Sequence, residues 1–186
     1  MDKVDISYLD GFKAFCESKS GLMAATLRNL LLVSSDGQNT PNVMTIGAAG
    51  IAFAGPCGWA FLVYVAPSRY TYGLLEENGD FTVNVPRAGM EDIVKYCGTV
   101  TGREHDKFRE QNLTAVPSRC VRSPIIGECA VHYECQLFCK LDAIPESMGE
   151  CMTTYYKGST NYHRLFQGHI RAIYADSDIA ESLGSM

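Results

Sequence analysis

Residues 129–141, Cys-Ala-Val-His-Tyr-Glu-Cys-Gln-Leu-Phe-Cys-Lys-Leu, form the stretch from which we infer the fold. Apolar and polar side chains alternate along it, which is typical of a β-strand with one face in a protein core. The apolar face carries Val131, Tyr133, Cys135, Leu137, Cys139 and Leu141, and the opposite face carries His132, Glu134, Gln136 and Lys140, with Phe138 as the exception. We therefore expect one long strand here.

Other segments on both sides of this strand also have the composition of strands. The turn signal Asp36-Gly37 separates the first two of them, and Gly55-Pro56-Cys57-Gly58 separates the next pair. In the last segment, 165–174, Phe166 and Ile170 lie on one side, and His169 and Arg171 lie on the other. Strands are expected at 27–35, 42–53, 59–66, 81–85 and 165–174.

Short helices are expected between these strands, at 68–79, 90–97 and 104–111. Ser68 is expected to cap the first helix, and Asn78-Gly79 to end it in the left-handed conformation. Gly98 is expected to end the second helix. Many strands with few short helices predict a mainly β protein, either a barrel or a sandwich with helices at its periphery.

The length and charge of the chain limit its organisation and its partners. The chain has 186 residues and a mass of 20.4 kDa, which favours a single domain over 1–186, with a short N-terminal extension at 1–25 and a polar tail at 176–186. The formal net charge is −5, from 16 basic and 21 acidic residues. We therefore expect no nucleic-acid partner.

A long stretch without charge, from Gly37 to Ser68, could be mistaken for a membrane span. Gly47, Gly50 and the Gly55–Gly58 turn interrupt it, so two buried strands joined by a turn explain it better, and we expect no membrane partner. The first residues show no basic start followed by an apolar run, so no secretory signal is expected. These observations predict a cytoplasmic protein.

The chain has eight cysteines, and their spacing argues against a metal or disulfide framework. No Cys-x-x-Cys pair occurs. Cys135 and Cys139 would lie roughly 13 Å apart along a strand, too far for a disulfide or a shared metal ion. We expect no metal site, reduced thiols, and core positions for Cys135 and Cys139.

Two segments can carry a ligand site. In Pro67-Ser68-Arg69-Tyr70-Thr71, at a helix start, free backbone N–H groups could meet a phosphate, and Ser68, Arg69 and Thr71 could add donors. The structural alternative is that Ser68 only caps the helix and Arg69 is solvated. We keep both interpretations of this segment.

The second segment is Cys97-Gly98-Thr99-Val100-Thr101-Gly102-Arg103. Its two glycines allow a backbone to approach a ligand closely, and Arg103 and Lys107 supply positive charge in an otherwise acidic protein. The alternative is a turn between two helices in which Gly98 ends the first helix. Spacing alone favours that alternative.

Taken together and in order, these motifs resemble the flavin reductase-like, FMN-binding split-barrel family, and within it the flavoredoxins. The resemblance extends from about Leu30 to Asp176. It rests on Asn42-Val43-Met44-Thr45-Ile46, Pro67–Thr71, Phe81-Thr82-Val83-Asn84-Val85-Pro86, Cys97–Arg103 with Asp106-Lys107-Phe108, Pro124-Ile125-Ile126, and Leu165-Phe166-x-Gly168.

The resemblance implies a mainly β, Greek-key-like split β-barrel with short peripheral helices. It also implies a homodimer with FMN at or near the interface, in which Ser68, Arg69 and Thr71 hold the phosphate. By the same resemblance, Asn42, Met44 and Thr45 would line the isoalloxazine and ribityl groups. Asn84, Cys97, Gly98, Thr101 and Lys107 would complete the cofactor site.

The function expected from this resemblance is an FMN-binding oxidoreductase with no obligatory catalytic residue, because the cofactor supplies the chemistry. It would be an NAD(P)H:flavin reductase, with NADH or NADPH as donor, or a flavoredoxin-like electron carrier with a protein redox partner. One alternative is a non-catalytic β-barrel that binds a flavin or haem. Another is a metal protein with cysteine ligands.

Overall fold

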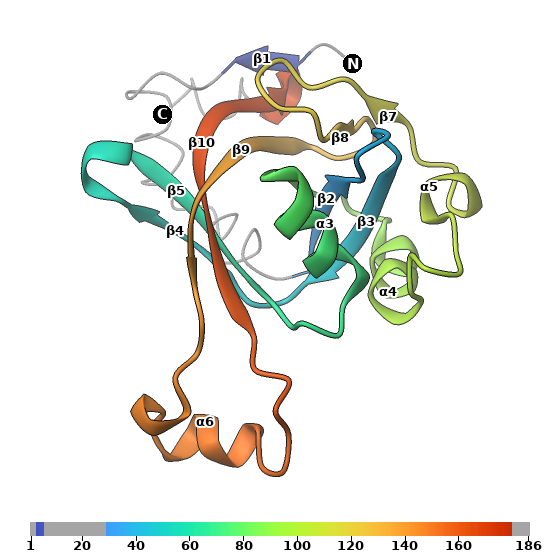
Figure 1. Cartoon of the computed structure of the whole chain (residues 1–186). Coiled ribbons are helices and arrows are strands. Elements are labelled where there is room, and N and C mark those ends of the chain that lie inside the picture. Colours follow the sequence, from blue (N-terminus) through green and yellow to red (C-terminus); the bar gives the residue numbers. More distant parts are fainter. Residues whose placement is uncertain (1–2, 6–28, 180–186) are drawn as a thin grey trace.

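The computed structural model describes residues 3–5 and 29–179, and its main feature is an antiparallel sheet that curls into an open barrel (Figure 1). The strand order is β3-β2-β6-β9-β10-β5-β4, and β1 pairs with β10. A second sheet contains only β7 and β8. The strands are β1 (Lys3–Asp5), β2 (Leu30–Ser35), β3 (Pro41–Ile46), β4 (Ala49–Phe53), β5 (Trp59–Val65), β6 (Asp80–Val85), β7 (Ala115–Val116), β8 (Ile125–Ile126), β9 (Val131–Leu141) and β10 (Arg164–Asp176).

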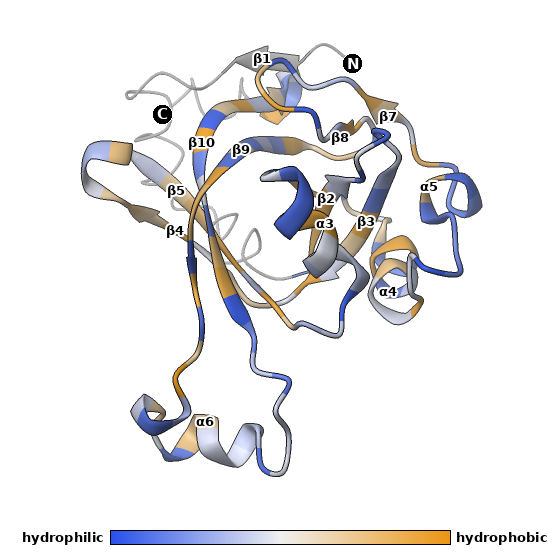
Figure 2. Ribbon diagram, viewed as in Figure 1, coloured by the Kyte–Doolittle hydropathy of each residue, from blue (hydrophilic) through white to orange (hydrophobic). Residues whose placement is uncertain are grey.

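Short helices lie between and beside these strands, so the expectation of a mainly β barrel with peripheral helices is confirmed (Figure 1). Figure 2 shows the hydrophobic residues along the barrel strands, whereas α5 is largely hydrophilic. The helices are α3 (Tyr70–Asn78), α4 (Glu91–Thr99), α5 (Lys107–Glu110) and α6 (Glu150–Tyr155), with 3₁₀ turns η1 (Gly55–Cys57) and η2 (Pro145–Ser147).

The barrel core is closely packed at Gly168 of β10. Cys135 is fully buried, as expected, and burial raises the pKa of its thiol well above the ordinary value. Cys139 is only partly buried, so the core position expected for it is wrong. Gly168 of β10 faces Cys135. A Cβ at Gly168 would come within 2.5 Å of the Phe81 ring and 2.8 Å of the Cys135 Cβ. The strand can therefore pass over the core only because residue 168 has no side chain.

The polar face of β9 is not the solvent-facing side that an alternating strand suggests. His132 and Glu134 are both fully buried. The carboxylate of Glu134 accepts the backbone N–H groups of Arg119 and Cys120, at 2.8 and 2.6 Å. The segment between β7 and β8 thus covers half of this face and satisfies the carboxylate. On the apolar face, Leu141 at the far end of β9 is half exposed.

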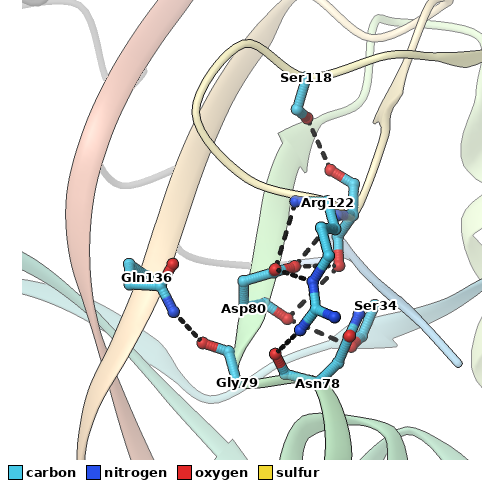
Figure 3. Close-up of polar contacts among 8 residues, drawn as sticks. Ser34, Asn78, Gly79, Asp80, Ser118, Arg122 and Gln136 are labelled. Carbon is cyan, nitrogen blue, oxygen red and sulfur yellow. Dashed lines mark hydrogen bonds and ion pairs between the residues drawn. The ribbon is translucent and has the colours of Figure 1, made fainter. Parts of the chain in front are cut away.

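The same segment also satisfies a second buried carboxylate, that of Asp80 on β6 (Figure 3). Asp80 accepts the Ser123 N–H at 3.0 Å and the Ser123 hydroxyl at 2.6 Å. Arg122 contacts the other oxygen and also donates to the carbonyl of Asn78 at the end of α3. This network joins β6, α3 and the covering segment at one end of the barrel.

Several elements differ from the sequence-based expectation. The strand expected at 42–53 is two strands, because β3 pairs with β2 and β4 pairs with β5. Helix α4 continues through Gly98 to Thr99 instead of ending at Gly98. The chain from 142 to 163, which contains α6, was not predicted to hold a helix. The left-handed end of α3 at Gly79 is confirmed, with φ 70°.

The described residues at the two chain ends lie side by side in the barrel sheet. Residues 1–2, 6–28 and 180–186, including Cys16 and the start of the strand expected at 27–35, lie outside the described residues. Lys3–Asp5 of the expected extension pairs with Tyr174–Asp176. Asp176 is buried and forms an ion pair with Arg87. Asp176, the first residue of the expected tail, is therefore also the last residue of β10.

Candidate functional site

A cavity of about 340 Å³ lies between β3, the start of α3, the end of α4 and the loop that leads to α5. Ten of the eleven residues predicted to bind a cofactor line it, from three separate stretches of the chain. These ten are Asn42, Met44, Thr45, Ser68, Arg69, Thr71, Cys97, Gly98, Thr101 and Lys107. The lining also includes Tyr70, Thr99, Val100, Gly102, Arg103 and Glu104, which the sequence-based set left out.

The start of α3 forms one wall of the cavity, but Ser68 is not its capping residue. The helix begins at Tyr70, and Arg69 is the N-cap residue without a side-chain cap. The prediction that Ser68 caps the helix is therefore wrong. Its hydroxyl instead accepts a hydrogen bond from Asn161. The first turn of α3 thus keeps uncapped N–H groups, and the positive end of the helix dipole lies at the cavity.

Thr71 is oriented by β3. Its Oγ1 accepts a hydrogen bond from Asn42 Nδ2 at 2.9 Å, and both residues are buried. Because Oγ1 is the acceptor in this contact, the hydroxyl proton of Thr71 can be donated elsewhere. Asn42 and Thr71 both line the cavity, so the pair provides a fixed hydroxyl donor there.

Two cations face the cavity with few partners of their own. Lys107 is only 4% exposed, and its Nζ donates to the carbonyl of Cys97 at 2.9 Å. Burial lowers the pKa of Lys107, and the positive charge of Arg69 lowers it further. Within the described residues the Arg69 guanidinium has no hydrogen bond or ion pair. An anion placed between these two groups would offset the cost of burying positive charge.

Arg103 and Gly102 complete the lining of the cavity. Arg103 donates from Nη1 to the carbonyl of Ser68 at 3.2 Å, and its guanidinium lies 5.5 Å from the centre of the Tyr70 ring. A Cβ at Gly102 would come within 2.0 Å of Asn42 Oδ1 and 2.7 Å of the Tyr70 ring. Glycine at position 102 therefore lets the loop lie directly against β3 and α3.

Cys97 faces the cavity as a buried thiol. Burial raises its pKa to about 11, and the charge of Lys107 only partly opposes this shift. At neutral pH the group is therefore a neutral thiol, which is a poor nucleophile. The buried, neutral thiol of Cys97 is therefore suited to packing against a ligand and not to thiol chemistry.

Asn84 is the one predicted site residue that the structure does not bring into the cavity. It is fully buried in β6, where Nδ2 donates to the carbonyl of Leu31 and to Thr82 Oγ1. Its Oδ1 accepts the Ile126 N–H and contacts His132 Nδ1. The amide is satisfied inside the barrel, so it has no hydrogen-bonding capacity left for a ligand in the cavity.

A second cavity, of about 640 Å³, adjoins the first because Thr45, Gly98 and Thr99 line both. The end of β6 and the start of α4 contribute its other walls, and sequence reasoning did not select any of these residues for a site. The nearest signal is the Pro86 turn that follows β6. These further lining residues are Asn29, Val85, Pro86, Arg87, Ala88, Met90, Glu91, Val94 and Lys95.

The described part of the chain has neither a cluster of metal ligands nor a membrane-spanning helix. No group of three or more His, Cys, Asp or Glu side chains among residues 3–5 and 29–179 could hold a metal ion. Over the same residues, no helix has the length and apolar character needed to cross a membrane.

Solved structures with the same fold include two flavoredoxins. One, from Desulfovibrio vulgaris (Miyazaki F), matches with a TM-score of 0.65 and 26% identity, over 80% of this chain and 69% of that chain. The other, from Methanosarcina acetivorans, has a TM-score of 0.62 and 28% identity, over 80% and 68%. A protein from Shewanella frigidimarina with a split barrel domain shares the fold, with a TM-score of 0.64 and 14% identity, over 92% of this chain and 80% of that chain. The expected split-barrel fold is thus confirmed.

A curated relative from Archaeoglobus fulgidus, itself uncharacterised, is 36% identical over 112 residues, which is 60% of this chain and 60% of that protein. A second, from Pyrococcus abyssi, is 31% identical over 112 residues and 62% of its length. The chain thus matches about 60% of the length of these relatives. The family model described as "Flavin reductase like domain" matches residues 23–184, and the chain belongs to that family.

Proposed function

We propose that this protein binds FMN in the cavity between β3, α3 and α4 and acts as a flavin-dependent oxidoreductase. The observation that carries the proposal is the buried Lys107 beside the unpaired Arg69, at a helix start that is not capped. This combination suits a phosphate, which accepts several charge-assisted hydrogen bonds at once. Membership of the flavin reductase-like family makes a flavin phosphate the fitting anion.

Residues from all three lining segments would contact the cofactor. Ser68, Arg69 and Thr71 would bind the phosphate, with Lys107 and Thr101 beside them. Asn42, Met44, Thr45, Cys97 and Gly98 would lie along the ribityl and ring. Bound FMN would supply a ring that accepts a hydride or single electrons. We leave Asn84 out of this site, because its amide is satisfied inside β6.

The adjoining cavity provides space for more of a ligand than its phosphate, because it extends the first cavity beyond Thr45 and Gly98. Thr45, Gly98 and Thr99 connect the two spaces, so a ring lying on Thr45 and Gly98 would be open towards the second cavity. That space could admit the nicotinamide of NADH or NADPH, or leave the ring accessible to a protein redox partner. A flavin reductase uses the first route and a flavoredoxin-like carrier uses the second.

We also propose that the protein is a homodimer, as the family resemblance implies. Large apolar side chains remain on the surface, among them Phe53 at 66% and Tyr155 at 70% exposure. Sedimentation analysis tests this proposal, and a monomer at all concentrations would contradict it.

We also propose a cytoplasmic location for the protein. The free thiols of the described cysteines agree with this location, because a reducing compartment keeps thiols free.

The test of the cofactor is a pair of titrations with FMN and riboflavin, followed by flavin fluorescence. We expect FMN to bind at least tenfold more tightly, because a charge-assisted phosphate contact is worth about 1.5–3 kcal/mol. Equal affinities would contradict the phosphate site. A parallel titration with FAD compares the mononucleotide with the dinucleotide.

Oxidation of NADH and NADPH then separates the two proposed activities. Fast turnover with either nucleotide indicates a reductase. Retained flavin with slow nucleotide oxidation, but rapid transfer from the reduced flavin to cytochrome c, indicates a carrier. A flavin that is retained but passes electrons to no acceptor would support the alternative of a non-catalytic binding barrel.

A further inference from the structure

An arm between β9 and β10, comprising residues 142–163, returns to the barrel beside Ser68. The arm carries η2 and α6 and projects away from the barrel (Figure 1). Arg164 fixes its base, because the guanidinium contacts Asp142 at 2.6 and 2.9 Å and Glu76 at 2.9 Å. The last residues of the arm are therefore held in a defined place against the start of α3.

Asn161, near the end of this arm, contacts Ser68 through both ends of its side-chain amide. Its Oδ1 accepts the Ser68 backbone N–H at 3.1 Å, and its Nδ2 donates to Ser68 Oγ at 2.9 Å. A backbone N–H can only donate, so the oxygen of the amide must face it and the NH₂ group must face Oγ. The hydrogen-bond network thus fixes the orientation of the amide.

This orientation determines what the Ser68 hydroxyl can do. Because Oγ accepts a hydrogen bond from Asn161, its own proton is free to be donated in another direction, and Ser68 lines the cavity. An accepted hydrogen bond also polarises a hydroxyl and makes it a stronger donor. The Ser68 carbonyl accepts from Arg103, so two separate segments hold the residue.

The backbone N–H of Ser68 is used by Asn161 and is not available to a ligand in this arrangement. Ser68 can therefore contribute to an anion site only through its hydroxyl, and that contribution depends on the arm. Asn161 itself is not among the residues that line the cavity.

We propose that Asn161 is a positioning residue for the phosphate site: it holds Ser68 so that the hydroxyl donates to the phosphate of a mononucleotide. This inference rests on the proposed function and adds to it a residue of the arm that none of the motifs contains. Its action is indirect, since it touches Ser68 and not the ligand.

The experiment measures dissociation constants for FMN and riboflavin. Because the two ligands differ only by the phosphate, the ratio of the constants gives the contribution of the phosphate to affinity. In Asn161→Ala we expect FMN to bind roughly three- to tenfold more weakly, and riboflavin to bind within about twofold of wild type, since one hydrogen bond is involved. Asn161→Asp should weaken FMN further. Its carboxylate only accepts, so it would attract the Ser68 proton and place negative charge beside the phosphate.

A double-mutant cycle separates positioning from a general structural effect. In a Ser68→Ala background, Asn161→Ala should change FMN affinity by less than about twofold. Asp142→Asn, which loosens the base of the arm without touching Ser68, is the matched control and should leave the FMN-to-riboflavin ratio unchanged.

Three results would overturn the role of Asn161 and leave the phosphate site standing: an unchanged ratio in Asn161→Ala, the same loss in the Ser68→Ala background, or an equal loss in Asp142→Asn. A wild-type protein that binds FMN no more tightly than riboflavin would overturn the proposed phosphate site and, with it, this inference.

Discussion

Lys107 reaches across the loop between α4 and α5 and donates a hydrogen bond from Nζ to the backbone carbonyl of Cys97, at 2.9 Å. The contact joins the start of α5 to the last turn of α4. Its ammonium group is nearly fully buried beside the cavity, and burial lowers its pKa. A buried ammonium group whose hydrogen-bond partner is a neutral carbonyl lowers the stability of the folded protein. A bound anion beside Lys107 would offset that cost.

Replacing Lys107 by Met tests this interpretation. We expect FMN to bind about tenfold more weakly, because a charge-assisted contact to the phosphate is lost, and riboflavin affinity to change by less than about twofold. Without ligand, the melting temperature should not fall, because Met fills the space of the lysine stem and removes a buried charge. Fluorescence titration and calorimetry measure the two effects. A less stable variant with normal FMN affinity would contradict this role.

The variant Arg69→Ala tests the second cation. Arg69 is the N-cap residue of α3 but gives the helix no side-chain cap, so its removal should leave the fold intact. We expect FMN affinity to fall by about tenfold, through loss of a charge-assisted contact. The control is Arg171→Ala, an exposed arginine on β10 outside both cavities. Circular dichroism checks the fold, and equal losses in both variants would argue for a nonspecific charge effect.

Much of the candidate site could be predicted from the sequence, because its parts are short local motifs. The Ser68–Thr71 corner and the Gly98–Gly102 loop are each visible in a few residues, and the structure brings both to one cavity. Asn84 shows the limit of such motifs. Alternation along β6 does not reveal that its amide is satisfied by β2, β8 and β9.

Other parts of the fold depend on contacts between residues distant in the sequence. The polar face of β9 is buried because the chain from 115 to 126 returns to cover it and gives Glu134 two backbone donors. Likewise, Ser68 satisfies the pattern of a helix cap, yet its partner is Asn161, more than 90 residues away. Local patterns cannot reveal a partner contributed by another segment.

The close approach at Gly102 gives a prediction with a matched control. In Gly102→Ala the new Cβ would meet Asn42 Oδ1 and the Tyr70 ring, so the loop must move away from β3. We expect FMN affinity to fall by tenfold or more, with a loss of stability of about 1–3 kcal/mol. Gly47→Ala is the control, because nothing lies within 4 Å of its Cβ position. Normal FMN binding in Gly102→Ala would show that the loop is not part of the site.

Cys135→Ser tests whether the β9 thiol is structural. The residue is fully buried against Gly168, and a serine hydroxyl there would lack room for water. We expect the free energy of unfolding to fall by about 1–3 kcal/mol, while electron transfer per bound flavin is retained. The exposed Cys151, changed to Ser, should alter neither quantity. A stable Cys135→Ser protein that has lost redox activity would instead assign the thiol a chemical role.

His163, at the end of the arm, should make stability depend on pH. Its backbone N–H donates to the Tyr156 hydroxyl at 3.2 Å, and the oxygen of that hydroxyl also lies 2.5 Å from Nδ1. A neutral ring with Nδ1 unprotonated can accept the hydroxyl proton in this contact. Burial, and then the charge of Arg69, lower the pKa of His163. In the window below the ordinary histidine pKa of about 6.5, the unfolded chain thus binds more protons than the folded one.

The folded state should consequently lose stability as the pH falls from about 7 towards 5, by more than in His163→Gln, whose side chain does not titrate. Carboxylates that titrate at lower pH contribute equally to both proteins, so the difference between them isolates His163. Urea unfolding across this pH range measures that difference. Added FMN should reduce it, because a phosphate beside Arg69 offsets the charge that lowers the pKa. Parallel pH profiles for the two proteins would mean that His163 takes up its proton equally in the folded and unfolded states.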